Sequence, residues 1–261
     1  MGAKYDQHFL ADPAAADAIV RAAGARPGAA VVEIGPGRGA LTELLLSAGA
    51  AVTAVEVDPR LAQTLGARLG DKALTVLNAD FLRVDLSLLP APCVVVSNLP
   101  YSAGTPITLR LLGWPAWQTA VLMFQKEVAE RVVAEPGGRD YGLLTLAVRA
   151  WADAELLLTV PRRNFRPPPK VDAGVVRLTR LAVSRLPAGV SAAEFSRVTR
   201  AAFAQRRKMA SKSLSSVLSL PRTRVDAAFS ACGLDPSARA ETISFEGFAA
   251  LAAALREGAA C

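Results

Sequence analysis

Histidine and cysteine are scarce in this chain of 261 residues, and their scarcity excludes several kinds of chemistry. His8 is the only histidine, so a catalytic triad built on histidine is not expected. The three cysteines, Cys93, Cys232 and Cys261, are too few and too scattered for a disulfide framework or a paired-cysteine zinc site. We therefore expect neither metal catalysis nor a histidine triad.

Long apolar runs are also lacking. No stretch reaches the roughly 18 uninterrupted apolar residues that a membrane span requires, and the first residues, with Lys4, Asp6 and Asp12, lack the apolar core of a signal peptide. Apolar residues nevertheless make up 52% of the chain, enough to bury a sizeable core. We expect a soluble, cytoplasmic protein that does not associate with membranes.

Acidic residues are nearly absent from one long segment. The formal net charge is +7 and the pI is about 9.8, and between Arg177 and Arg224 the only acid is Glu194. The segment holds nine further basic residues: Arg180, Arg185, Arg197, Arg200, Arg206, Arg207, Lys208, Lys212 and Arg222. Such an excess predicts a phosphate-bearing partner, although a solvated helix face is the alternative.

Short β-branched runs alternate with helix-length segments in the first part of the chain. This alternation is typical of βαβ units and a parallel sheet. A later pair, 156–160 and 174–181, flanks a proline-rich loop and predicts an antiparallel hairpin at the sheet edge. The expected parallel strands are Val31–Ile34, Val52–Val57, Leu74–Asn78, Cys93–Ser97 and Ala120–Phe124.

A change of pattern divides the chain. The segment around Pro187 and Gly189 has linker composition, and the text after it is helical, with no further strand signal. We expect an α/β domain over residues 1–183 and a small C-terminal α-helical domain over residues 190–261.

A glycine-rich loop follows the first expected strand, in Glu33–Gly39. Gly35 and Gly37 let backbone amides approach a ligand closely. The next strand ends at Glu56, 21 residues beyond Gly35 (56 − 35 = 21), where an acid can accept hydrogen bonds from a ribose diol. Asp80 follows the third strand and could accept from an adenine amino group. A nucleotide cofactor is indicated. The loop leaves nicotinamide and S-adenosylmethionine open, although its spacing departs from that of dehydrogenases.

The fourth expected strand ends in Asn98–Leu99–Pro100–Tyr101, and these residues suit attack by an adenine amino group. The lone pair of this nitrogen is delocalised into the ring. Acceptors at its hydrogens, the Asn98 side-chain oxygen and the Leu99 carbonyl, would draw the nitrogen toward a tetrahedral shape. Pro100 fixes the turn, and Tyr101 offers a face for an extruded base. A helix is expected to follow, capped at Thr105–Pro106.

With these motifs in place, the chain resembles the ribosomal RNA adenine dimethyltransferases. This family comprises small-subunit enzymes of the KsgA type and the related Erm macrolide-resistance methyltransferases. The matching segments run in order along the chain: Gln7–Leu10, Glu33–Glu43, Glu56–Asp58, Asn78–Asp80, Asn98–Tyr101, Gln125–Glu127, Phe165–Asp172, Gln205–Lys208 and Arg239–Ser244.

The resemblance implies a Rossmann-like class I methyltransferase that uses S-adenosylmethionine and releases S-adenosylhomocysteine. It implies cofactor contacts from His8, Leu10, Gly35, Glu56, Asp80 and Asn98. It also implies that Asn98 and Leu99 hold the target amino group while Tyr101 and Phe165 sandwich the flipped base. The sequence departs from the family pattern at His8, where asparagine is frequent, and at Ser102 and Met209.

The implied substrate is a pair of adjacent adenosines near the 3′ end of small-subunit rRNA, each methylated twice on N6 within immature 30S particles. Arg206, Arg207, Lys208 and Lys212 are the expected RNA contacts, and a monomer is expected. An Erm-type enzyme that modifies one large-subunit adenosine is the nearest alternative. An RNA-binding assembly factor without the chemistry is another.

Overall fold

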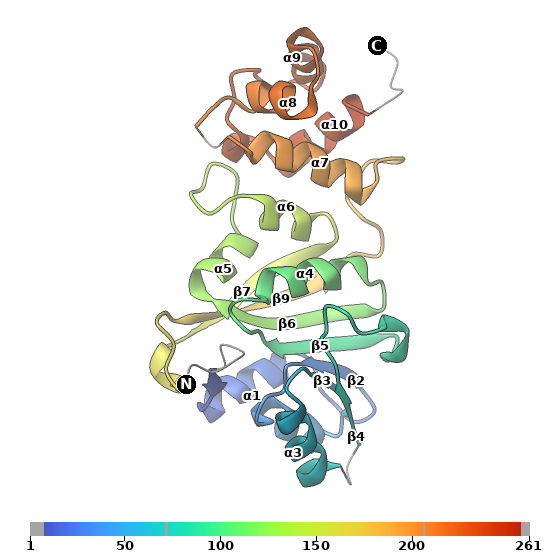
Figure 1. Ribbon diagram of the computed structural model, residues 1–261, viewed down its shortest axis with the longest axis vertical. Helices are drawn as coiled ribbons and strands as arrows, with labels where there is room; N and C mark the ends of the chain where they lie inside the picture. Colours follow the sequence, from blue (N-terminus) through green and yellow to red (C-terminus); the bar gives the residue numbers. More distant parts are fainter. Residues whose placement is uncertain (1–7, 71–72, 206, 257–261) are drawn as a thin grey trace. The chain divides into compact units, whose positions relative to one another are not determined.

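The computed structural model describes residues 8–70, 73–205 and 207–256 (Figure 1). The chain forms two compact units. The first comprises Met1–Glu130 and Ala152–Arg180, and the second comprises Arg131–Trp151 and Leu181–Cys261. Among the described residues no helix has both the length and the apolar character needed to cross a bilayer.

A seven-stranded sheet forms the centre of the first unit (Figure 1). Its first five strands are parallel, and the last two run antiparallel to their neighbours. The prediction of a mostly parallel sheet with an antiparallel edge hairpin is confirmed. In sheet order the strands are β4 (Leu74–Asn78), β3 (Ala51–Glu56), β2 (Ala30–Ile34), β5 (Cys93–Asn98), β6 (Trp117–Gln125), β9 (Ala173–Arg180) and β7 (Ala152–Val160).

Both faces of the sheet are covered because the strands carry apolar residues on both sides. Val31 of β2 packs with residues of α1 (Pro13–Ala22), α2 (Ala40–Ser47) and α3 (Pro59–Leu69) in one core cluster. Alternate residues point to the opposite face. There Phe124 lies against α4 (Gly104–Gly113), since a Cβ added at Gly104 would meet its ring at 3.4 Å. Helices on both faces are typical of a doubly wound α/β fold.

The carboxyl ends of the parallel strands meet at one edge. Glu33 on β2 pairs in register with Val96 on β5, so the turns after these two strands emerge side by side. In open α/β sheets ligands bind at this edge. A two-stranded sheet, β1 (Phe9–Leu10) with β8 (Phe165–Arg166), adds an N-terminal segment to the unit.

The helix after β5 starts earlier than expected. α4 begins at Gly104 with Ala103 as its N-cap, so Pro106 occupies the first turn instead of the first helical position. Proline is tolerated there because the first N–H groups of a helix have no partner within it. The remaining elements of this part are η1 (Leu86–Leu88), α5 (Lys126–Val132) and η2 (Arg162–Asn164).

The second unit is helical. Its core gathers aromatic and aliphatic side chains such as Phe195, Phe229 and Phe248, all 4% exposed or less. Its elements are α6 (Leu143–Arg149), α7 (Ala192–Phe203), α8 (Ala210–Leu218), α9 (Arg222–Ala231), η3 (Ala240–Thr242) and α10 (Phe245–Ala254).

This unit contains residues that the expected division placed in the first domain. Residues 131–151 belong to it, because Leu146 of α6 lies in the same core cluster as Val198 of α7. The backbone N–H of Arg185 donates to the Ala150 carbonyl at 3.0 Å. The expected domain of residues 1–183 therefore contains a helical insertion that folds with the C-terminal helices.

Two glycine substitutions test the packing of the sheet. In β9, a Cβ at Gly174 would lie 2.5 Å from Cβ of Ala129, so Gly174→Ala should lower the free energy of unfolding by about 1–3 kcal/mol. In α3, a Cβ at Gly66 would meet only Val76, at 4.0 Å, so Gly66→Ala should raise it by about 0.5–1 kcal/mol. Urea unfolding measures both. Equal stability of Gly174→Ala and the parent chain would contradict the packing.

Candidate active site

A pocket opens at the carboxyl edge of the parallel strands, and it brings together most of the predicted site. The lining comes from β1, from the loop between β2 and α2, and from the ends of β3 and β5. The predicted residues among the lining are His8, Leu10, Gly35, Gly37, Glu56, Asn98, Leu99, Pro100 and Tyr101.

Two predicted residues are not part of this lining. The Asp80 carboxylate accepts a hydrogen bond from the backbone N–H of Leu82 at 2.9 Å, within the turn after β4. Phe165 is fully buried, at 0% exposure, in the core cluster with Val160 and Val175. In this conformation Phe165 offers no face to a base, and its prediction as a stacking residue does not match its burial. The Phe165 ring packs against the apolar side chains of this cluster and is not exposed to solvent.

The glycine-rich loop wraps closely around the pocket. Gly37 has φ +57°, a left-handed conformation that favours glycine. A Cβ at this position would lie 3.0 Å from the Phe9 ring. The Gly37 N–H donates to the Glu56 carboxylate at 3.0 Å. Gly37 therefore permits the turn of the loop and two close approaches, to Phe9 of the N-terminal segment and to the Glu56 carboxylate.

Glu56 can still receive a diol. Its carboxylate, only 3% exposed, accepts from the Gly37 N–H and from the Asp58 N–H at 2.9 Å. An ionised carboxylate has about four acceptor positions, so two remain for ribose hydroxyls. Beside it Val57 is 40% exposed and lines the same pocket, which gives an apolar surface for a flat base. An acid and an apolar side chain in this arrangement fit an adenosine moiety.

Glu33 was not predicted as a site residue, although it lines the pocket. Glu33 is 1% exposed and accepts a hydrogen bond from the Thr42 hydroxyl at 2.6 Å. The pKa of Glu33 is raised to about 7. Burial is the largest cause, the hydrogen bond from Thr42 partly opposes it, and the nearby Glu56 charge makes a smaller contribution in the same direction as burial. The available signal was an acid within an apolar strand immediately before the glycine loop.

A hydrogen bond fixes the orientation of Asn98. Its side-chain nitrogen donates to the His8 backbone carbonyl at 3.0 Å. Because a carbonyl can only accept, the amide nitrogen must face it, and Oδ1 is left as the acceptor of the group. The His8 ring lies 5.4 Å from the Tyr101 ring, centroid to centroid, and its Nδ1 is 2.8 Å from the Pro167 carbonyl.

Two arginines also line the pocket without having been predicted. The Arg38 guanidinium lies 4.5 Å above the Phe9 ring, a cation–π contact that holds the N-terminal segment on the glycine loop. Arg166 donates to the carbonyls of Arg163 and Phe165 at 2.9 and 3.0 Å.

The predicted RNA contacts lie in the second unit. Arg207 and Lys208 are exposed just before α8, and Lys212 is exposed in its first turn. No acidic side chain of the residues that the structure describes lies within ion-pair distance of these three. Arg206 lies outside the described residues. The RNA-binding role of all four stays a prediction.

The chain matches one protein family over nearly all of its length. The family model described as "Ribosomal RNA adenine dimethylase" covers residues 2–257. The chain is 45% identical over 255 residues to "Ribosomal RNA small subunit methyltransferase A" of Cereibacter sphaeroides ATCC 17025, covering 94% of this chain and 89% of the relative. It is 44% identical over 259 residues to the protein of the same name from Myxococcus xanthus, covering 97% and 91%.

Solved structures agree with this match. A dimethyladenosine transferase from Plasmodium falciparum is similar with a TM-score of 0.77 and 26% identity, covering 94% of this chain and 96% of that structure. The 23S rRNA methyltransferase ErmE is similar with a TM-score of 0.71 and 31% identity, covering 95% and 100%. The Rossmann-like class I methyltransferase fold expected from the sequence is confirmed.

The raised pKa of Glu33 predicts a pH-dependent stability. Its pKa is about 7 in the folded chain and 4.5 as the ordinary value, so between these values the folded state holds a proton that the unfolded state releases. The free energy of unfolding therefore falls as pH rises from about 4.5 to 7. Glu33→Gln removes this effect, so its Tm relative to the parent chain should rise between pH 5 and pH 8. A Tm difference independent of pH would contradict the burial.

The pocket provides an acid and an apolar surface for adenosine, with an oriented asparagine and an aromatic ring at the tip of β5. The fold, the order of the motifs and the comparisons agree with that arrangement. The chain belongs to the ribosomal RNA adenine dimethylase family and is an S-adenosylmethionine-dependent rRNA adenine dimethyltransferase.

Proposed function

We propose that this enzyme dimethylates N6 of two adjacent adenosines near the 3′ end of small-subunit rRNA during assembly of the 30S particle. The observation that carries the proposal is the position of Asn98 and Leu99 in the same pocket as Glu56. The reacting nitrogen and the methyl donor would thus meet in one cavity. The curated relatives named as small-subunit methyltransferases support the choice of substrate.

The cofactor would lie along the carboxyl edge of the sheet. Glu56 accepts hydrogen bonds from the ribose, Val57 packs on the adenine, and Gly35 and Gly37 leave room for the remainder of the molecule. S-adenosylmethionine supplies an electrophilic methyl group on a positively charged sulfur and leaves as S-adenosylhomocysteine. The buried Glu33 carboxyl lies in the same lining, where its ionised form stabilises a cationic ligand.

The target base would be held at the tip of β5. The Asn98 Oδ1 and the Leu99 carbonyl accept the two hydrogens of the amino group, which frees the nitrogen lone pair for attack on the methyl carbon. Tyr101 stacks on the base. The nitrogen then loses a proton to solvent. Positioning supplies most of the rate enhancement, so the chain needs no general base.

Phe165 has a smaller part in this proposal than the resemblance implies. A stacking role would require the ring to leave the core, where it is 0% exposed. We therefore assign base stacking to Tyr101 alone and retain Asp80 as a proposed contact of the adenine amino group.

The remaining parts of the proposal concern the partner and the setting. The exposed cations Arg207, Lys208 and Lys212, with Arg206, would contact phosphates of the rRNA. We propose that the enzyme acts as a monomer in the cytoplasm, on immature 30S particles.

A second candidate function is methylation of large-subunit rRNA. The similarity to ErmE, at 31% identity and a TM-score of 0.71, favours it. The higher identity to proteins named as small-subunit methyltransferases, 45% and 44% in two cases, favours the first function.

Substrate choice separates these candidates. Labelled S-adenosylmethionine is incubated with the enzyme and either immature 30S particles or protein-free large-subunit rRNA, and the modified nucleosides are mapped. We expect N6,N6-dimethyladenosine at two adjacent positions of the 30S rRNA. Label on the large-subunit RNA alone would move the assignment to the resistance enzymes. Label on neither RNA would point to an assembly factor.

The role of Asn98 predicts a selective loss of turnover. Asn98→Ala removes one of the two acceptors, whose contacts count most in the transition state, so kcat should fall by at least about 100-fold. The Kd for S-adenosylmethionine should stay within roughly tenfold. Single-turnover methylation and calorimetric titration measure the two quantities. A variant with undiminished turnover would remove Asn98 from its role.

A further inference from the structure

The basic residues near α8 fall into two kinds. Arg207, Lys208 and Lys212 are exposed and have no acidic partner among the described residues. Arg222 instead pairs with Asp226, with its Nε 2.8 Å from each carboxylate oxygen. The charge of Arg222 is therefore compensated within the protein, although Arg222 belongs to the same basic segment of the sequence as the three exposed cations. Arg222 is available for something other than binding phosphate.

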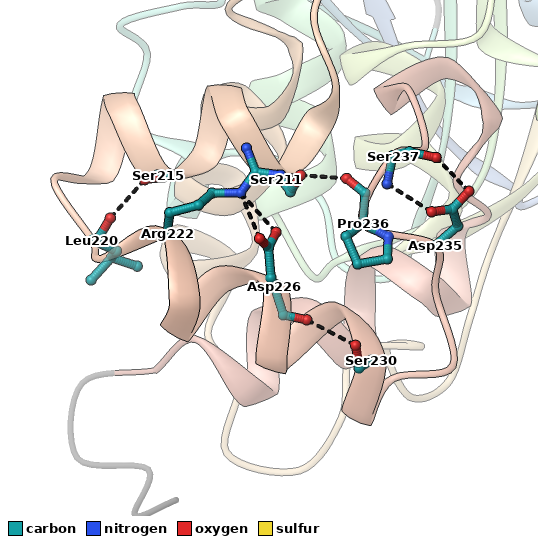
Figure 2. Close-up of polar contacts among 9 residues, drawn as sticks. All are labelled: Ser211, Ser215, Leu220, Arg222, Asp226, Ser230, Asp235, Pro236 and Ser237. Atoms are coloured by element: carbon teal, nitrogen blue, oxygen red, sulfur yellow. Dashed lines mark hydrogen bonds and ion pairs between the residues drawn. The ribbon is translucent and has the colours of Figure 1, made fainter.

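Figure 2 shows the hydrogen bonds that connect Arg222 to Ser211 and Ser211 to Pro236. Its Nη2 donates to the Ser211 hydroxyl oxygen at 2.9 Å, and that hydroxyl donates in turn to the Pro236 backbone carbonyl. Ser211 is fully buried, at 0% exposure. We call Ser211, Arg222 and Asp226 the α8 clamp, because they connect the first turn of α8 to α9 and to the turn at residues 235–238.

That turn is itself fixed. The Asp235 carboxylate accepts from the Ser237 backbone N–H at 2.8 Å and from its hydroxyl at 2.5 Å (Figure 2). The turn also returns a second bond to α8, since the Ala210 N–H donates to the Ala238 carbonyl at 2.8 Å. The first turn of α8 is thus held by two neighbouring hydrogen bonds to one internally hydrogen-bonded turn and by Arg222 from α9.

The clamp adjoins the unpaired cations in the sequence. Lys208 lies two residues before the first residue of α8, and Lys212 directly follows Ser211 in its first turn. Successive helix residues point about 100° apart, so a buried Ser211 directs Lys212 outward, and Lys212 is exposed. Fixing Ser211 therefore fixes the rotation of α8 and the point from which Arg207 and Lys208 project.

We propose that the α8 clamp positions the basic segment 207–212 for contact with RNA phosphates, and that Ser211 and Arg222 are positioning residues that do not touch the RNA. The inference rests on the proposed function, in which this segment binds rRNA. Cations that are already spaced to match phosphates lose less conformational freedom on binding. The clamp would supply that order without adding a positive charge of its own.

A purely structural role is the alternative, and Ser215 provides the matched control. Ser215 lies one turn further along α8, and its hydroxyl donates to the Leu220 carbonyl at 2.8 Å (Figure 2). Ser211→Ala and Ser215→Ala each remove one hydroxyl-to-carbonyl bond from the same helix and change no charge, but only Ser211→Ala also removes the acceptor of the Arg222 Nη2. Each loss should lower Tm by about 2–4 °C.

RNA affinity distinguishes the two variants. The Kd for immature 30S particles and for protein-free small-subunit rRNA is measured between 50 and 200 mM salt, well below Tm. Ser211→Ala should weaken binding about fivefold or more. It should also make the affinity less dependent on salt, by the equivalent of about one phosphate contact. The slope of the logarithm of the binding constant against the logarithm of the salt concentration should change by roughly 0.7–0.9. Ser215→Ala should match the parent chain in both, and the Kd for S-adenosylmethionine should be unchanged in both variants.

A neutral substitution can reduce the salt dependence only by displacing cations, so the slope is the decisive readout. Ser211→Ala with the Kd and slope of the parent chain would overturn the inference and leave the proposed function intact. Failure of the parent chain to bind either RNA would overturn both. Arg222→Gln gives a second test. Its effect should not add to that of Ser211→Ala, whereas additive losses would make Arg222 a phosphate ligand and contradict the positioning role.

Discussion

The hydrogen bond from the Asn98 side chain to the His8 carbonyl is the contact on which the site depends. It joins the tip of β5 to the N-terminal segment of the chain, and it determines which atom of the Asn98 amide is left as an acceptor. The His8 carbonyl can hold this position because the residues that follow it in the sequence are fixed by other contacts. Phe9 and Leu10 pair with β8, and Asp12 caps α1 and contacts the side chain of Asn164. The position of one oxygen thus depends on elements distant in sequence.

The same edge of the sheet concentrates negative charge where a cationic ligand is expected. Glu33 and Glu56 both line the pocket, and both are almost fully buried. Burial disfavours the charged form of Glu33 and raises its pKa, and the nearby Glu56 charge adds a smaller effect in the same direction. Stability given up at this edge is typical of a binding site.

Much of the fold followed from the sequence because its signals are local. The five parallel strands and the edge hairpin were visible as β-branched runs, and the pocket residues Gly35, Glu56 and Asn98 followed from their place at strand ends. What could not be predicted depends on tertiary contacts. Residues 131–151 carry no signal that they fold with the C-terminal helices, and the proline-rich loop around Phe165 does not decide between a ring that faces a base and a ring that packs in the core. Glu33 belongs to the glycine-loop motif, but its burial depends on the packing of α2 and cannot be predicted from the spacing of the motif.

The central claim is that two oxygen atoms at the tip of β5 accept the hydrogens of the target amino group. The most direct measurement is a crystal structure of the enzyme with S-adenosylhomocysteine and adenosine. The geometry predicts N6 of the base within about 2.7–3.2 Å of both Asn98 Oδ1 and the Leu99 carbonyl oxygen, with Tyr101 against the ring. A base bound elsewhere, or bound with either oxygen turned away from N6, would contradict the claim.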